Sequence, residues 1–226
     1  MNTKRVLGAV AITAAVVLGM QGCLPFLESD ERRTVTYGVA ESVKELVVEG
    51  ENGGVVVTGT GDAVHVVEKQ SYRGSAPKTT HEVKDGVLRL GYSCDSCGVG
   101  YEVQVPAGTK VRIKEENGGV RLAGLAAEVD AAVENGGVEA TGLTSPTAHL
   151  SATNGGVRAD FAAAPAALEA KVGNGGVRLR VPSGAAYAVD AQAGNGGSDV
   201  SVPSQPGAAH SITARAETGG VTVSGV

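Results

Sequence analysis

The sequence predicts an all-β fold, a parallel β-solenoid built from coils of about 20 residues with an irregular β cap. Three observations lead to this prediction. The word Asn-Gly-Gly recurs along the chain, apolar and polar residues alternate on both sides of it, and the residues expected to face inward are small. The chain contains 34 Gly and no Trp, and only 3% of its 226 residues are aromatic. A core without large aromatic side chains must be thin, as in a narrow coil.

Residues 1–22 have the features of an export signal. Two basic residues precede an uncharged apolar run, Val6 to Met20, which is short for a membrane-spanning helix. The segment Met20-Gln21-Gly22-Cys23 resembles the end of a bacterial lipoprotein signal, although Leu usually stands where Met20 does. The resemblance implies that Cys23 is acylated and begins the mature chain. An uncleaved anchor and an ordinary secretory peptide are the alternatives.

The rest of the chain divides into a tether and a repeat domain. Residues 23–33 are polar and without a clear period, as expected of a short lipidated tether. Residues 34–226 form the repeat domain, with a cap and irregular coils over 34–105 and regular repeats over 106–226. Strand-like runs lie within the irregular part, at Ala63–Val67, Val83–Leu90 and Tyr101–Val105. We expect this part to close one end of the solenoid, because an uncapped coil exposes its core and its strand edges.

The repeats are anchored on one structural turn. Its Asn residues are Asn52, Asn117, Asn135, Asn154, Asn174 and Asn195, and Thr218 starts a seventh copy. From Asn117 onward the copies are 18 to 23 residues apart. Six, four and two residues before each of the six turns from Asn117 onward stand apolar residues expected to face inward, with Glu115 the one exception among eighteen. Period-2 alternation on both sides of the turn predicts two short, half-buried strands per repeat.

Two architectures fit this pattern. Asn-Gly is a strong hairpin signal, which would give an antiparallel β meander. Alternatively, each turn is a corner of a solenoid whose parallel strands stack about 4.8 Å apart. We favour the solenoid because the second Gly also recurs in all seven copies, and close backbone packing at a stacked corner would require it. Its coils should wind right-handed. On this view Gly155→Val and Gly156→Val should be about equally harmful.

The repeats also carry a family resemblance. Residues 105–125 (VPAGTKVRIKEENGGVRLAGL) and the tandem units after them resemble the bacterial β-strand-repeat "putative adhesin" family, a domain of unknown function. The resemblance covers most of residues 40–226. It implies a parallel β-helix and carries no established catalytic residues.

Few residues suggest chemistry. Cys94 and Cys97 are expected to form a local disulfide, because with Cys23 acylated they are the thiols that remain in an oxidising compartment. A redox motif would need a following helix, and a zinc site would need further ligands such as His65 and His81, which lack ligand spacing. We therefore expect no metal and no cofactor. The outward charges Arg121, Glu139, Arg158, Arg178 and Asp199 are expected to form one ladder on a solvated face. A polysaccharide-binding stripe is the alternative, which the lack of exposed aromatic side chains on this face disfavours.

These features predict a non-catalytic lipoprotein rather than an enzyme. We expect it to be extracytoplasmic, lipid-anchored to the outer face of the bacterial cell membrane, and adhesin-like or a scaffold for envelope interactions. Its expected partners are the membrane, through the lipid, and an envelope protein or surface glycan. The net charge of −5 argues against nucleic acid. A carbohydrate-active β-helix enzyme and a metal- or redox-sensing lipoprotein built on Cys94 and Cys97 are the alternatives.

Overall fold

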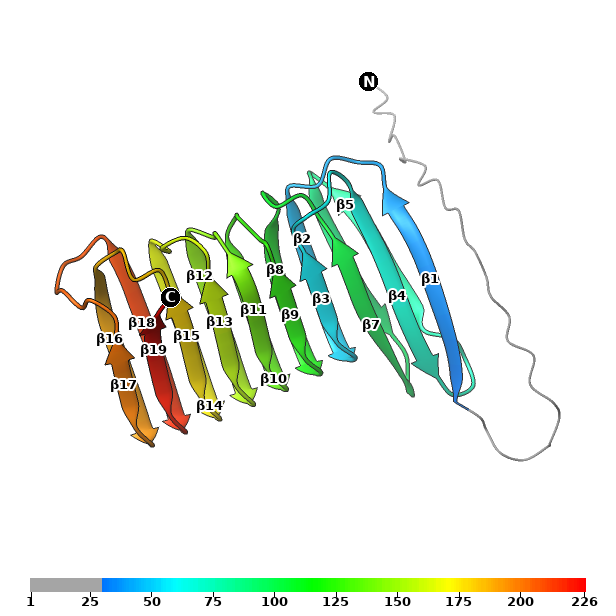
Figure 1. Ribbon diagram of the computed structural model, residues 1–226. Coiled ribbons are helices and arrows are strands. Elements are labelled where there is room, and N and C mark those ends of the chain that lie inside the picture. Colours follow the sequence, from blue (N-terminus) through cyan, green and yellow to red (C-terminus); the bar gives the residue numbers. More distant parts are fainter. Residues whose placement is uncertain (1–29) are drawn as a thin grey trace, which may run out of the picture.

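A computed structural model describes residues 30–226, and it contains two β-sheets packed face to face along a solenoid (Figure 1). The proposed signal segment and Cys23 lie outside the described residues. The ten-stranded sheet has the order β1 (Glu31–Val39), β4 (Val64–Tyr72), β7 (Cys97–Gln104), β3 (Val55–Thr58), β9 (Val120–Ala123), β11 (Val138–Leu143), β13 (Val157–Phe161), β15 (Val177–Val181), β19 (Val221–Gly225) and β17 (Ser198–Ser201). The nine-stranded sheet has the order β16 (Tyr187–Asn195), β18 (His210–Thr218), β14 (Ala167–Asn174), β12 (Thr147–Asn154), β10 (Val129–Asn135), β8 (Lys110–Asn117), β2 (Glu45–Asn52), β6 (Val87–Ser93) and β5 (Lys78–Lys84).

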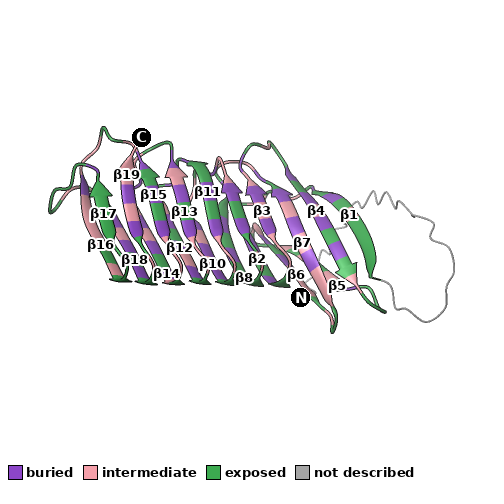
Figure 2. Ribbon diagram, turned by 60° about the horizontal axis from the view of Figure 1, so that its bottom comes forward, coloured by how far each residue is buried: buried purple, intermediate pink, exposed green. Residues whose placement is uncertain are grey.

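Each regular coil contributes one strand to each sheet, and the Asn-Gly-Gly turn joins the two strands. Strands of neighbouring coils pair in parallel, with Asn135 opposite both Asn117 and Asn154. The prediction of a parallel β-solenoid is therefore confirmed, and the alternative of an antiparallel meander is wrong. Along the regular coils the core between the sheets consists mainly of small and branched side chains such as Ala131, Val133 and Ala140, and the larger Tyr101 and Tyr187 are buried toward its two ends. Figure 2 shows the resulting alternation of buried and exposed residues along the strands.

The corner explains why the first Gly of each turn recurs. Its φ lies between 132° and 158° in all seven copies, a conformation that side chains other than glycine rarely adopt. The backbone also leaves no room for a side chain. A Cβ on Gly155 would lie 1.8 Å from the carbonyl oxygen of Gly136 in the neighbouring coil. The close stacking is held by backbone hydrogen bonds, such as the 2.8 Å bond that Gly155 N–H donates to Asn174 O.

The second Gly is less constrained than the sequence suggested. Gly156 has no positive φ, and a Cβ there would lie 3.1 Å from the Gly176 carbonyl oxygen, which is tight but not impossible. The structure therefore favours unequal tolerance, with Gly155 the more restricted of the two, over the equal intolerance expected from the sequence.

Spatial order departs from chain order at both ends of the solenoid. The last coil in sequence, β18–β19, inserts between β14–β15 and the coil β16–β17, which becomes the terminal one. Burial explains the exchange. Ile212, Ala214 and Val223 are buried inside the inserted coil, whereas the terminal coil has Ser198 where other coils place an inward Val. Ser198 Oγ donates to Ala191 O across the open end, at 3.2 Å.

The other end carries a cap formed within residues 34–105, which differs from the sequence-based expectation in one respect. The coil β2–β3, which contains the first Asn-Gly-Gly, stacks directly on β8–β9 as a regular coil. The chain then leaves to form β4, β5 and β6, and it returns through β7, so the antiparallel pairs of the described residues, β1–β4, β4–β7 and β5–β6, all lie at this end.

Two strand boundaries also differ from the sequence-based expectation. The run Val83–Leu90 is not one strand, because Asp85 and Gly86 both have positive φ and form a turn between β5 and β6. Strand β1 begins at Glu31 and so takes in the last three residues assigned to the tether. Glu31 is held there by pairing with Tyr72 of β4.

The two glycines of one corner should differ in their tolerance of a methyl group. We expect Gly155→Ala to destabilise the protein by about 3 kcal/mol or more, since the strained φ and the Gly136 carbonyl both oppose a Cβ. Gly156→Ala should cost less than about 1 kcal/mol. Urea unfolding of both variants and the wild type measures the difference. Equal losses at the two positions would contradict this account of the corner.

Candidate functional site

The solenoid has one long edge formed by the Asn-Gly-Gly corners, and the candidate site is built around it. The Asn side chains stack there in a ladder. Asn135 Nδ2 donates to Asn117 Oδ1 at 3.0 Å, and Asn154 and Asn174 repeat the contact with the preceding Asn at 2.9 and 3.0 Å. These amides are exposed at the corner. The inserted coil ends the ladder, because it places Thr218 between Asn174 and Asn195.

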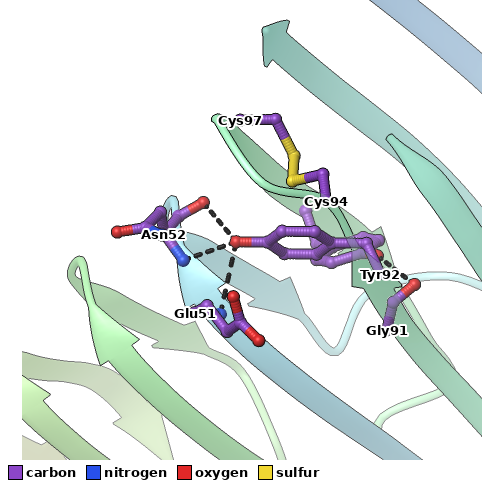
Figure 3. Close-up of a disulfide and its surroundings, with 7 residues drawn as sticks. Glu51, Asn52, Gly91, Tyr92, Cys94 and Cys97 are labelled. Atoms are coloured by element: carbon purple, nitrogen blue, oxygen red, sulfur yellow. Dashed lines mark hydrogen bonds between the residues drawn. A yellow bond between two sulfur atoms is a disulfide. The ribbon is translucent and has the colours of Figure 1, made fainter. Parts of the chain in front are cut away.

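Tyr92 terminates the ladder at the cap end (Figure 3). Strand β6 pairs with β2 only as far as Leu90 and Val48, so the backbone of Glu51 and Asn52 has no strand partner on that side. The Tyr92 hydroxyl takes this place. It donates to Asn52 O at 2.8 Å and accepts from the Asn52 N–H and Glu51 N–H. Burial raises the pKa of this phenol above its ordinary value.

Cys94 and Cys97 lie directly after Tyr92 and are joined by a disulfide, with their Cα atoms 6.0 Å apart. Figure 3 shows the disulfide beside the Tyr92 ring. The loop that it closes connects β6 to β7, where a regular coil has Asn-Gly-Gly. The chain after this loop packs closely against the neighbouring coil. Gly98 lies so near to it that a Cβ on this residue would be 2.8 Å from Asn52 O. The disulfide loop thus substitutes for a corner in the cap.

The described residues contain no group of three or more His, Cys, Asp and Glu placed to hold a metal ion. The histidines have other surroundings. His81 packs against Tyr37, with ring centroids 4.8 Å apart, and His210 Nδ1 lies 2.8 Å from Pro165 O. His149 Nδ1 lies 3.1 Å from Glu169 Oε2 on the outer face of the nine-stranded sheet. Lys171, and to a smaller extent His149, hold the pKa of the Glu169 carboxyl below its usual range.

Charged side chains form a row across the outer face of the ten-stranded sheet. Register places Arg121 opposite Glu139, Glu139 opposite Arg158, and Arg158 opposite Arg178. The sequence-based ladder is wrong at its end, because the inserted coil puts Thr222 between Arg178 and Asp199. Arg121 Nε lies 3.6 Å from Glu139 Oε2. Arg158 and Arg178 make no ion pair within the described part of the chain.

Two of the grooves beside the Asn-Gly-Gly edge lie on the coils away from the cap. One lies on the ten-stranded sheet over Gly156 and Gly176, and Arg158, Arg178 and Glu139 are among its lining side chains. The other lies on the nine-stranded sheet over Gly173 and Gly194, beside Lys171, Arg215 and Glu217. Both occur where glycine leaves a gap in a row of side chains. Toward the cap, the same edge carries the exposed glutamates Glu51, Glu116 and Glu134, which stand in register on successive coils.

Glu115 is the one inward residue that breaks the apolar pattern. Its side chain is 1% exposed, and neither carboxylate oxygen has a hydrogen-bond partner. It occupies the space opposite Gly50, where a Cβ would lie 2.0 Å from Glu115 Oε2. Burial, with a smaller contribution from Glu116, raises the pKa of Glu115 to about 7. The broken pattern was visible in the sequence, but its partner Gly50 was not.

A second buried carboxylate, Glu68 in the cap, shows the usual arrangement. Tyr37 Oη donates to Glu68 Oε1 at 2.8 Å and Gln70 Nε2 donates to Oε2 at 2.9 Å, so both oxygens are satisfied. Neither buried glutamate lines one of the two grooves. These carboxylates are therefore part of the core and not of a surface site.

The sequence profile of the family described as Toastrack DUF4097 matches residues 25–224. The chain belongs to this family. The Toastrack domain here spans both the cap and all the corners, so the whole described structure is one family domain. The resemblance to a "putative adhesin" repeat family that the sequence indicated is confirmed.

Two solved structures share the Toastrack architecture of this chain. A "putative cell adhesion protein" from Clostridium sporogenes superposes with a TM-score of 0.54 at 13% identity, covering 87% of this chain and 100% of that one. A "putative adhesin" from Bacteroides fragilis has a TM-score of 0.50 at 13% identity and covers 88% and 99%. At this identity the likeness concerns the fold alone. No protein of curated function matches the sequence.

The buried Glu115 should make stability depend on pH. The folded state holds this proton more tightly than the unfolded chain, whose glutamates titrate near 4.5, so the free energy of unfolding should fall as pH rises from about 4.5 to 7. We expect Glu115→Gln to remove on the order of 2 kcal/mol of this fall. Urea unfolding at pH 5 and pH 8 measures it.

Glu134→Gln is the control for this experiment, because Glu134 is an exposed glutamate on the neighbouring coil. Its stability should follow that of the wild type at both pH values. If Glu115→Gln and the wild type differ by the same amount at pH 5 and pH 8, then the Glu115 carboxyl does not titrate in this range.

Proposed function

We propose that this chain is a non-catalytic, adhesin-like lipoprotein, tethered to the outer face of the bacterial cell membrane, that binds an envelope protein or a surface glycan. The observation that carries the proposal is the uncovered outer surface of both sheets, where register arranges exposed side chains in rows along the solenoid. Such a repetitive, extended surface suits a partner that is itself extended. The names given to the two solved proteins of this fold point to the same role.

The two grooves described above lack the paired carboxyl groups of a glycoside hydrolase. Glycoside hydrolases place two carboxyl groups on opposite sides of the scissile bond. The groove on the ten-stranded sheet contains one carboxylate, Glu139, and the groove on the nine-stranded sheet contains Glu217 alone. A convergent acid and base pair is therefore missing from both of these grooves.

The membrane attachment rests on Cys23 and the apolar run before it. Within residues 30–226 the chain has no helix that is long and apolar enough to cross a bilayer. An acylated Cys23 would place the folded domain within a short reach of the membrane, since β1 begins at Glu31. Stable anchoring requires two or more acyl chains, as a bacterial lipoprotein carries.

Cys23→Ala tests the anchor. We expect the variant to leave the membrane fraction or to accumulate as a precursor of higher mass than the mature polypeptide, because the acyl acceptor is lost. Cell fractionation combined with mass spectrometry of the purified chain gives the readout. The double variant Cys94→Ala/Cys97→Ala is the control and should stay in the membrane fraction. A normally processed, membrane-bound Cys23→Ala protein would refute lipid attachment.

The binding role is tested with intact cells. Cells that carry the full chain should retain more purified envelope polysaccharide from their own species than cells that lack it. Cells carrying Gly155→Val, which should disrupt the fold and leave Cys23 in place, are the control for the anchor alone. Equal retention by all three would contradict a glycan-binding role and leave an envelope protein as the partner, which cross-linking on the same cells would identify.

A further inference from the structure

Arg158 and Arg178 are an unusual pair on this surface. They are direct register partners on β13 and β15, and both are exposed. Adjacent strands lie about 4.8 Å apart, so the two positive charges repel one another. Elsewhere in the described part of the same row a cation stands next to an anion that pairs with it, as Arg121 does with Glu139.

The neighbouring carboxylates do not neutralise this pair. Glu139 faces Arg158 from β11, yet its carboxylate turns to Arg121. Asp160, two residues along β13, lies 3.8 Å from Arg180 instead. On the far side of Arg178 the register partner is Thr222, which is uncharged. Two guanidinium groups are therefore left with their hydrogen-bond donors open to a ligand.

The groove gives this ligand a place to lie. Gly156 and Gly176 form its floor, next to the two arginines. The carbonyl oxygens of these two glycines are already paired, because Val157 N donates to Gly176 O at 3.0 Å and Val138 N donates to Gly156 O at 2.9 Å. The charged donors beside the groove are the two arginine side chains. Arginine has a planar fork of donors that binds the two oxygens of a carboxylate or phosphate group together.

We propose that Arg158 and Arg178 form a binding site for the anionic groups, carboxylate or phosphate, of an acidic surface polysaccharide. The inference rests on the proposed function, since it assigns the site and the ligand chemistry of the same glycan-binding surface. The row is open along the solenoid, so a polymer can continue past the site in both directions. The chain as a whole does not favour polyanions, because its net charge is −5 with both arginines included. Binding thus depends on this local pair.

Titration calorimetry on the full chain in detergent, at low ionic strength, tests the proposal. The probes are polygalacturonate for carboxylate, poly(glycerol phosphate) for phosphate, and neutral dextran. We expect the wild type to bind one or both polyanions and not dextran. Arg158→Ser/Arg178→Ser should weaken binding by about tenfold or more. Arg158→Lys/Arg178→Lys should fall between the two, because lysine keeps the charge and loses the fork.

The matched control is Arg89→Ser/Arg112→Ser. It removes the same charge from the other sheet, where Arg112 pairs with Glu45 and Asp130, and Arg89 has Glu82 as its register partner. We expect it to change affinity by less than about threefold. Thermal unfolding of each variant confirms that the fold is retained, which is expected because all four arginines are exposed.

Three outcomes would overturn the assignment. The wild type binds neither polyanion, or Arg158→Ser/Arg178→Ser binds as tightly as the wild type, or the control variant loses as much affinity as Arg158→Ser/Arg178→Ser. The cell assay separates this failure from that of the proposed function. If cells carrying Arg158→Ser/Arg178→Ser retain as much envelope polysaccharide as the wild type, the site is wrong and the binding role stands. If no cells retain it, both the glycan role and the site fall.

Discussion

The position of one carbonyl oxygen in each corner constrains the whole solenoid. The Gly136 carbonyl oxygen lies where Gly155 would carry a Cβ, and the same close approach occurs at the other stacked corners. Coils can stack at this distance only because the first residue after Asn has no side chain and adopts a positive φ. Fixing the corner fixes the register of both strands that leave it, because a slip of one residue would turn every inward side chain outward. The thin Ala- and Val-rich core follows from that register.

A stack of equivalent coils must also end, and the two ends are finished differently. At one end antiparallel strands, the Tyr92 hydroxyl and the disulfide loop take over the hydrogen bonds and the turn that a further coil would supply. At the other end the terminal coil has Ser198 at an inward position, bonded across the opening to Ala191. Both solutions place polar groups where an unfinished apolar core would otherwise meet water.

The same register that builds the core organises the surface. Residues at one position of the repeat become neighbours about 4.8 Å apart on successive coils, so a single substitution changes a row rather than an isolated spot. Glutamates before the turn therefore form an acidic row near the cap, whereas glycine at related positions opens grooves beside arginine and lysine farther along. In the core, Gly50 and Glu115 show the same rule, because the missing side chain of one residue accommodates the carboxylate of its register partner.

The sequence by itself determined the parts that are local or periodic. The spacing of Asn-Gly-Gly gave the coil, and the alternation around it gave the inward and outward positions, including Glu115 as an exception and Arg158 beside Arg178. Only the tertiary structure decided which coils are neighbours at the ends. All corners are chemically alike, so β18–β19 can stack on Asn174 in place of the coil that follows it in the chain, and burial of the more apolar coil selects this order. The contacts of Gly50 with Glu115 and of Tyr92 with Asn52 also could not be predicted from the sequence. Each joins residues 40 or more positions apart, and only the stacking brings them together.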